Sequence, residues 1–97
     1  MGTQGGITLK TLSDTVFLME SAEYKNRFVG EYLQLRIRID KLNKLLAEYR
    51  VKMATGESIP YKCTYNMLED QLYAMEQYRQ SLEERAIVED IDVWSCL

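Results

Sequence analysis

The 97-residue chain contains no histidine and only two cysteines, Cys63 and Cys96, which form no CxxC pair. A zinc site needs four ligands, and a Cys-His nucleophile pair needs an imidazole. The sequence therefore predicts two reduced thiols, no metal site and no cofactor. P-loop, GxSxG, HExxH and EF-hand patterns are also missing, and adjacent carboxylates such as Glu83 and Glu84 diverge by about 100° on a helix. We expect no enzymatic activity.

Long apolar runs are absent as well, and the chain opens without a basic-then-apolar leader. A soluble, cytoplasmic protein that makes no membrane contact is therefore expected. The net charge of −3 disfavours general DNA binding, because the molecule as a whole repels polyanions. Three of the five glycines lie in the first six residues. We expect residues 1–10 to be a flexible segment and residues 11–97 to form one helical domain.

The strongest pattern present is a heptad repeat. The stretch YLQLRIRIDKL, residues 32–42, alternates as a strand would, but the apolar spacing of four and three residues continues well beyond it. This spacing favours a helix over residues 22–54, capped by Ser21, and excludes the short strand. Its seam residues are Phe28, Tyr32, Leu35, Ile39, Leu42, Leu46, Tyr49 and Met53.

Gly56 and Pro60 end this pattern and predict a loop over residues 55–65. A second helix is expected over residues 66–89, with Asn66 or Thr64 as its N-cap. A short helix over residues 12–20, preceded by a Thr11–Asp14 capping box, completes the set. The predicted fold is all-α: an antiparallel hairpin with the short helix across one end, assembling into a homo-oligomeric helical bundle.

The oligomer is inferred from a second apolar row on the long helix. Val29, Leu33 and Ile37 follow one another at i,i+4, and Leu45 extends the row. A hairpin alone would leave it in water, so these residues, together with Trp94 near the C-terminus, are the predicted oligomer interface of a dimer or larger assembly. The alternative is that the short helix and the C-terminal VWSCL segment cover the row within one chain.

A basic and aromatic set forms the candidate ligand site: Arg38, Tyr61, Lys62, Tyr65 and Arg79. Arginine binds phosphate or carboxylate, and tyrosine stacks on bases. Arg79 occupies a seam position, where it can extend to solvent, pair with Glu31 or Glu76, or hold an anion. Arg36 belongs to a solvated face of alternating charges that also contains Asp40, Lys44, Glu48 and Lys52.

Two blocks of the sequence resemble a known family. The run SAEYKNRFVGEYLQLRIRIDKL, followed after the loop by LEDQLYAMEQYRQSLEERAIVE, resembles small proteins of bacterial viruses and prophages that are grouped with a small protein of crAss-like phages. The resemblance covers about residues 20–90. It implies an accessory protein made in the host bacterial cytoplasm, and it assigns no functional residue.

Two functions follow as hypotheses. In the first, the protein is a non-enzymatic inhibitor of host anti-phage defence that sequesters a nucleotide signal, such as a cyclic nucleotide, or occludes a host defence protein, with the ligand site at a subunit junction. In the second, it is a structural coiled-coil assembly module without a ligand.

Overall fold

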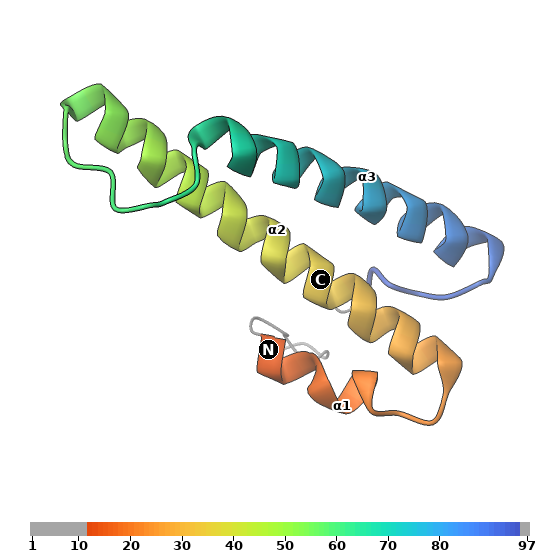
Figure 1. Ribbon diagram of the computed structural model, residues 1–97. Coiled ribbons are helices and arrows are strands. Elements are labelled where there is room, and N and C mark those ends of the chain that lie inside the picture. The colour runs from red at the N-terminus through yellow and green to blue at the C-terminus, as the bar shows by residue number, and fades with distance from the viewer. Residues whose placement is uncertain (1–11, 96–97) are drawn as a thin grey trace.

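The computed structural model describes residues 12–95, and in that range the regular elements are all helical. A 3-10 turn η1 (Leu12–Thr15) leads into the short helix α1 (Val16–Met19), followed by the long helix α2 (Tyr24–Thr55) and by α3 (Tyr65–Val88) (Figure 1). The predicted all-helical fold is confirmed, with long-helix boundaries within about two residues of those expected. The flexible segment proposed for residues 1–10, the Thr11 cap and Cys96 lie outside the described residues.

The ends of α2 have clear local causes. Ser21 was predicted to cap this helix, but its hydroxyl accepts a hydrogen bond from the Glu23 amide at 3.1 Å, and the helix begins only at Tyr24. At the other end, Gly56 follows the last helical residue with φ 73°, a left-handed conformation that glycine adopts without steric cost. The loop then runs from Gly56 to the next cap.

A side-chain hydrogen bond sets the start of α3, and backbone hydrogen bonds set its end. The Thr64 hydroxyl accepts from the Met67 amide at 3.2 Å, so Thr64, not Asn66, is the N-cap. After Val88 the Ile91 amide donates to the Ala86 carbonyl at 2.8 Å, which closes a Schellman motif. Asp90 takes the left-handed position of this motif with φ 57°.

α2 and α3 run antiparallel along the heptad seam (Figure 1). Tyr24 at the start of α2 contacts Glu89 just after α3, whereas Tyr49 near the end of α2 packs on Tyr65 at the start of α3. All predicted seam residues of α2 are buried except Met53, which is 49% exposed because it lies beyond the start of α3.

The core divides into two clusters. The covered cluster consists of Phe28, Tyr32, Leu33, Leu35, Ile39, Leu82, Ala86, Ile91 and Val93. The loop-end cluster consists of Leu42, Leu46, Tyr49 and Leu68, with Ile59, Tyr61 and Tyr65 packed against it.

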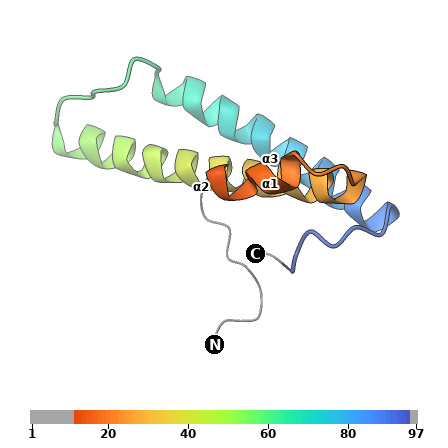
Figure 2. The ribbon, with the colours of Figure 1, turned by 90° about the horizontal axis from the view of Figure 1, so that it is seen from below.

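The second apolar row of α2 is covered within the chain. α1 lies on the side of α2 opposite α3, and the segment after α3 turns back along α2 (Figures 1 and 2). Leu33 and Ile37 are consequently buried, at 2% and 8% exposure, and Ile91 and Val93 join Leu33 in the covered cluster. Burial of Leu33 and Ile37 agrees with the alternative given above, in which the chain covers this row itself. Self-association is not needed to bury these two residues, and it stays a prediction.

Gly30 makes the docking of α1 possible. A methyl group built on its Cα would lie 2.9 Å from the Leu18 Cβ and 2.9 Å from the Met19 sulfur. These distances are shorter than van der Waals contact, so only glycine lets α1 approach α2 this closely. Glycine destabilises a helix interior by about 1 kcal/mol relative to alanine, and the close packing of α1 on α2 offsets this cost.

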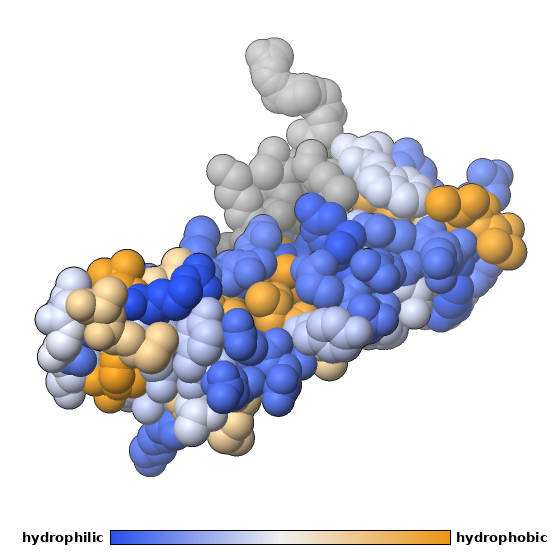
Figure 3. Space-filling view, turned by 90° about the horizontal axis from the view of Figure 1, so that it is seen from above, coloured by the Kyte–Doolittle hydropathy of each residue, from blue (hydrophilic) through white to orange (hydrophobic). Residues whose placement is uncertain are grey.

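The surface is divided between polar and apolar areas. Seen from above, the molecule shows hydrophobic patches at its two ends, separated by mostly hydrophilic surface (Figure 3). Among the described residues, no helix combines the length and the low charge that crossing a membrane requires.

Candidate functional site

The five residues of the predicted ligand site do not meet within one chain. Tyr61, Lys62 and Tyr65 lie at the loop end beside Tyr49, whereas Arg79 lies in the middle of α3, where it shares a hollow with Arg36. The 13 residues from Arg36 to Tyr49 span about 20 Å of helix. Arg38 is exposed on α2.

The loop tyrosines hold the loop against the hairpin. The Tyr49 ring lies 5.3 Å from that of Tyr61 and 5.5 Å from that of Tyr65, measured between centroids. The Tyr49 hydroxyl donates to the Cys63 carbonyl at 3.3 Å, and Arg50 donates to the Tyr65 hydroxyl at 2.7 Å. Two of the three predicted loop residues therefore serve packing, and Lys62 is the one that is exposed.

Arg79 is paired with carboxylates of its own helix. Its Nε and Nη2 donate to Glu76 Oε2 at 3.1 and 2.7 Å, and its Nη1 donates to Glu83 Oε2 at 2.8 Å. Of the three alternatives for this residue, pairing is the one that the structure bears out, with Glu76 as predicted and Glu83 as an additional partner. The hydrogen bond with Glu76, followed by that with Glu83, raises the pKa of Arg79 despite its partial burial.

Glu83 is the centre of this network. The Tyr32 hydroxyl donates to the same Oε2 atom, and Arg36 Nη1 lies 3.9 Å from it. Burial alone would raise the pKa of Glu83, but the hydrogen bonds from Tyr32 and Arg79, with the charges of both arginines, lower it. Burial of the phenol, followed by its hydrogen bond to Glu83, raises the pKa of Tyr32 against the opposing effect of Arg36.

Sequence reasoning missed Glu83 because it considered this residue only beside Glu84. The available signal was its position four residues after Arg79, which places both side chains on one face of α3.

Arg36 was assigned to a solvated face, and that assignment is wrong. Its side chain is 37% exposed, and its Nη1 donates to the Tyr32 hydroxyl at 3.3 Å, so it lies in the groove between α2 and α3. Here a polar hollow of about 300 Å³ opens. It is lined by Arg36, Ile39, Asp40 and Asn43 of α2 and by Glu76 and Arg79 of α3.

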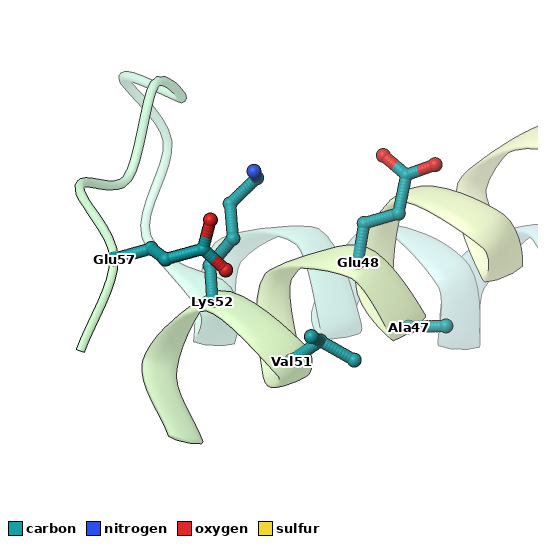
Figure 4. A pocket seen from close by; sticks show the side chains of 5 residues that line it. All are labelled: Ala47, Glu48, Val51, Lys52 and Glu57. Carbon is teal, nitrogen blue, oxygen red and sulfur yellow. The ribbon is translucent and has the colours of Figure 1, made fainter. Parts of the chain in front are cut away.

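A second hollow, of about 290 Å³, lies at the C-terminal end of α2 (Figure 4). Ala47 and Val51 contribute apolar surface, while Glu48 and Lys52 point away from them and Glu57 enters from the loop (Figure 4). Val51 is 58% exposed. The hollow is therefore a shallow apolar shelf with charged edges.

A polar cluster joins the other ends of the two helices. The Tyr24 hydroxyl donates to Glu89 at 2.8 Å and accepts from Arg85 at 2.7 Å, and the Arg85 guanidinium lies 5.1 Å from the Phe28 ring centroid. Lys25 donates to the Asp90 carbonyl at 3.3 Å. The hydrogen bond from Tyr24 lowers the pKa of Glu89. This cluster closes the hairpin and was not predicted.

Of the predicted interface residues, three keep exposed surface: Val29, Leu45 and Trp94. Leu45 is half-buried against the loop-end cluster. Trp94 is 44% exposed and is positioned by Asp92, whose Oδ1 accepts from the amides of Trp94 and Ser95 at 3.0 and 3.1 Å. Leu33 and Ile37 are buried inside the chain, and Val29 is half-buried against the covered cluster.

Comparison with protein families gives a match to Sequestin over residues 22–87. The chain belongs to the Sequestin family. The match covers more than half of the chain and contains all of α2, α3 except its last residue, the Arg79 network and the polar hollow. α1 and the segment after α3, which contains Ile91 and Val93, lie outside the matched residues. Comparison with curated proteins and with solved structures gave no significant match.

Proposed function

We propose that this protein is a non-enzymatic binding protein of a phage or prophage that inhibits host defence by sequestration. The observation that carries the proposal is membership of the Sequestin family, whose name denotes sequestering. In one version the protein binds and sequesters a nucleotide signal. In the other it binds a host defence protein and occludes its surface. The phage context rests on the resemblance of residues 20–90 to small phage and prophage proteins.

The geometry supports a ligand-holding role in two ways. The hollow between α2 and α3 presents side chains that donate and accept hydrogen bonds. Arg36 and Arg79 in this hollow are held by the Glu83 network, so these two side chains are positioned before a ligand arrives. Preorganisation of this kind reduces the entropy lost on binding.

Calorimetric titration with linear and cyclic nucleotides tests the nucleotide version. We expect at least one nucleotide to bind with a dissociation constant below about 10 µM, which corresponds to about 7 kcal/mol. If every nucleotide in the panel binds more weakly than that, the nucleotide version is rejected. A screen for host proteins that co-purify with the full chain then tests the remaining version.

The second candidate is an assembly module in which self-association is the function. The exposed apolar residues Tyr73, Ile87 and Val88 of α3, at 68%, 70% and 84% exposure, favour it. Under this hypothesis, exchanging residues 61–65 preserves activity while polar substitution of Leu35 or Leu42 destroys it. Sequestration predicts damage from both. Light scattering that finds only an 11.4 kDa monomer at micromolar concentration excludes the assembly module.

A further inference from the structure

The polar hollow between α2 and α3 contains two residues of opposite charge, Arg36 and Asp40, that form no ion pair with each other. Arg36 and Asp40 stand one turn apart on the same face of α2, a spacing at which opposite charges ordinarily pair. Among the described residues, however, Arg36 forms a hydrogen bond to Tyr32 and an ion pair with Glu83, both through Nη1, and its guanidinium lies 5.9 Å from the Tyr32 ring centroid. Asp40 forms no ion pair within residues 12–95. The remaining guanidinium donors and the Asp40 carboxylate therefore stay available to a ligand.

Asn43 extends this set by a further turn. It lines the same hollow, and no hydrogen bond to its amide is found within residues 12–95. Ile39, which is buried, contributes apolar surface between the polar groups. The α2 wall thus offers a donor, an acceptor and an amide around one apolar residue.

The charge of the hollow decides which part of a ligand can enter. Arg79 is already engaged by Glu76 and Glu83, so it offers no free positive charge. Arg36 and Arg79 face the carboxylates of Asp40, Glu76 and Glu83, which leaves the region one negative charge in excess. A phosphate or carboxylate group is therefore disfavoured here. A neutral group with adjacent acceptors and donors is favoured.

Guanine has that arrangement. Its O6 and N7 atoms accept hydrogen bonds, and the two donors of an arginine side chain match this pair. Its N1–H and its N2 amino group donate hydrogen bonds, and the two oxygens of a carboxylate match that pair. Adenine presents an amine in place of O6 and an acceptor at N1, so both contacts would be lost. A purine also fits a hollow of about 300 Å³.

We propose that this hollow binds the guanine base of a nucleotide, with Arg36 on the O6 and N7 edge and Asp40 on the N1 and N2 edge. The phosphates remain outside the hollow, in solvent. The proposal rests on the nucleotide version of the proposed function and specifies the base that this function selects.

Calorimetric titration of the full chain with GMP, IMP and AMP tests the proposal. GMP is expected to bind at least tenfold more tightly than AMP, because each bidentate contact discriminates by roughly that factor. IMP, which lacks the N2 amine but keeps O6 and N1–H, is expected to fall between them. Equal affinities for GMP and AMP would overturn the guanine assignment while leaving nucleotide sequestration intact.

Two variants locate the contact. Asp40→Asn is expected to lower GMP affinity about tenfold and to narrow the difference between GMP and IMP, because the amide cannot accept from both guanine donors in the same way. Asp40 is exposed, so the fold is retained, and circular dichroism verifies this. Glu48→Gln is the matched control on the same helix, in the other hollow, and should leave GMP affinity unchanged.

The remaining outcomes separate the two levels of the proposal. If Asp40→Asn binds GMP as tightly as the unsubstituted chain, the hollow is not the base site, although nucleotides are still bound. If GMP, IMP and AMP all fail to bind at millimolar concentration and cyclic nucleotides fail as well, the guanine site and the nucleotide function are rejected together.

Discussion

The two core clusters of the hairpin differ in what surrounds them. The covered cluster is enclosed by α2, α3, α1 and the segment after α3, and its members Tyr32, Leu82 and Val93 are 0% exposed. The loop-end cluster has only two helices and a loop around it, and Leu68 there retains 9% exposure. One pair of helices therefore has a tightly closed half and a more open half. The difference lies in short covering segments, not in the heptad seam.

The largest expected effect comes from truncating a core leucine in each half. Leu82→Ala in the covered cluster should reduce the free energy of unfolding by about 4 kcal/mol, because the rigid surroundings cannot fill the cavity. Leu68→Ala in the loop-end cluster should cost about 2 kcal/mol, because the loop can relax into the space. Urea denaturation measures both. Equal losses would show that the two halves are equally well packed.

Glu83→Gln should have the next largest effect, about 2 kcal/mol at neutral pH, because Arg79 loses a charged partner and the Tyr32 hydroxyl is left with a neutral, weaker acceptor. The matched control is Glu84→Gln, an exposed neighbour on α3, which should change the unfolding free energy by less than about 0.5 kcal/mol. A similar loss in both variants would refute a specific role for the network.

The same substitution alters the pH dependence. The pKa of Glu83 is lowered in the folded chain, so its stabilising contribution is present above the pKa of about 4.3 expected when unfolded. That contribution is lost as the pH falls through the folded pKa. Denaturation at neutral and at acid pH should show a smaller acid-induced loss for Glu83→Gln than for the unsubstituted chain. Glu89 and Asp92, whose pKa values are also lowered, keep some acid sensitivity in the variant.

Gly30→Ala tests the docking of α1 on α2 directly. Alanine ordinarily stabilises a helix interior by about 0.5–1 kcal/mol relative to glycine. Here the added methyl group meets Leu18 and Met19, so we expect a net loss of about 1–2 kcal/mol and weaker docking of α1. Limited proteolysis near residues 20–23 should become faster. A gain in stability would mean that α1 does not press on α2 as described.

The smallest effect concerns the two left-handed residues that end the helices. Asp90→Gly at the covered end should stabilise the chain by up to about 1 kcal/mol, because glycine adopts this conformation without the steric cost. Gly56→Ala at the loop end should destabilise it by a similar amount through the backbone alone, since open space surrounds that position. Thermal unfolding compares the two. Effects of the same sign would contradict the assigned backbone conformations.

The helical hairpin was predictable because the seam repeats over several heptads, and a sustained period is a local property of the sequence. The segments that cover Leu33 and Ile37 could not be predicted. An apolar row indicates that its residues are buried, but it does not indicate which segment buries them. The spacing of α1 from α2 depends on Gly30, whose role becomes visible only when Leu18 is placed against it. Sequence patterns thus predicted where each helix lies in the chain better than which segments pack against it.

The site was less predictable for the same reason. Pairing of Arg79 with Glu76 follows from positions on one helix, and it was one of the three alternatives that the sequence left open. The contact from Tyr32 to Glu83 and the position of Arg36 depend on how α2 and α3 align, which no local pattern determines. Tyr61 and Tyr65 looked free because loops usually carry binding residues, yet here they pack on Tyr49.

Amide hydrogen exchange, resolved by residue, tests most directly whether the covered half is the stable one. We expect amides in residues 28–39 and 82–88 to exchange at least tenfold more slowly than those in residues 46–55 and 65–72, since opening the covered cluster requires the release of α1 and of residues 91–93 as well. Equal protection along both helices, or slower exchange at the loop end, would contradict the account.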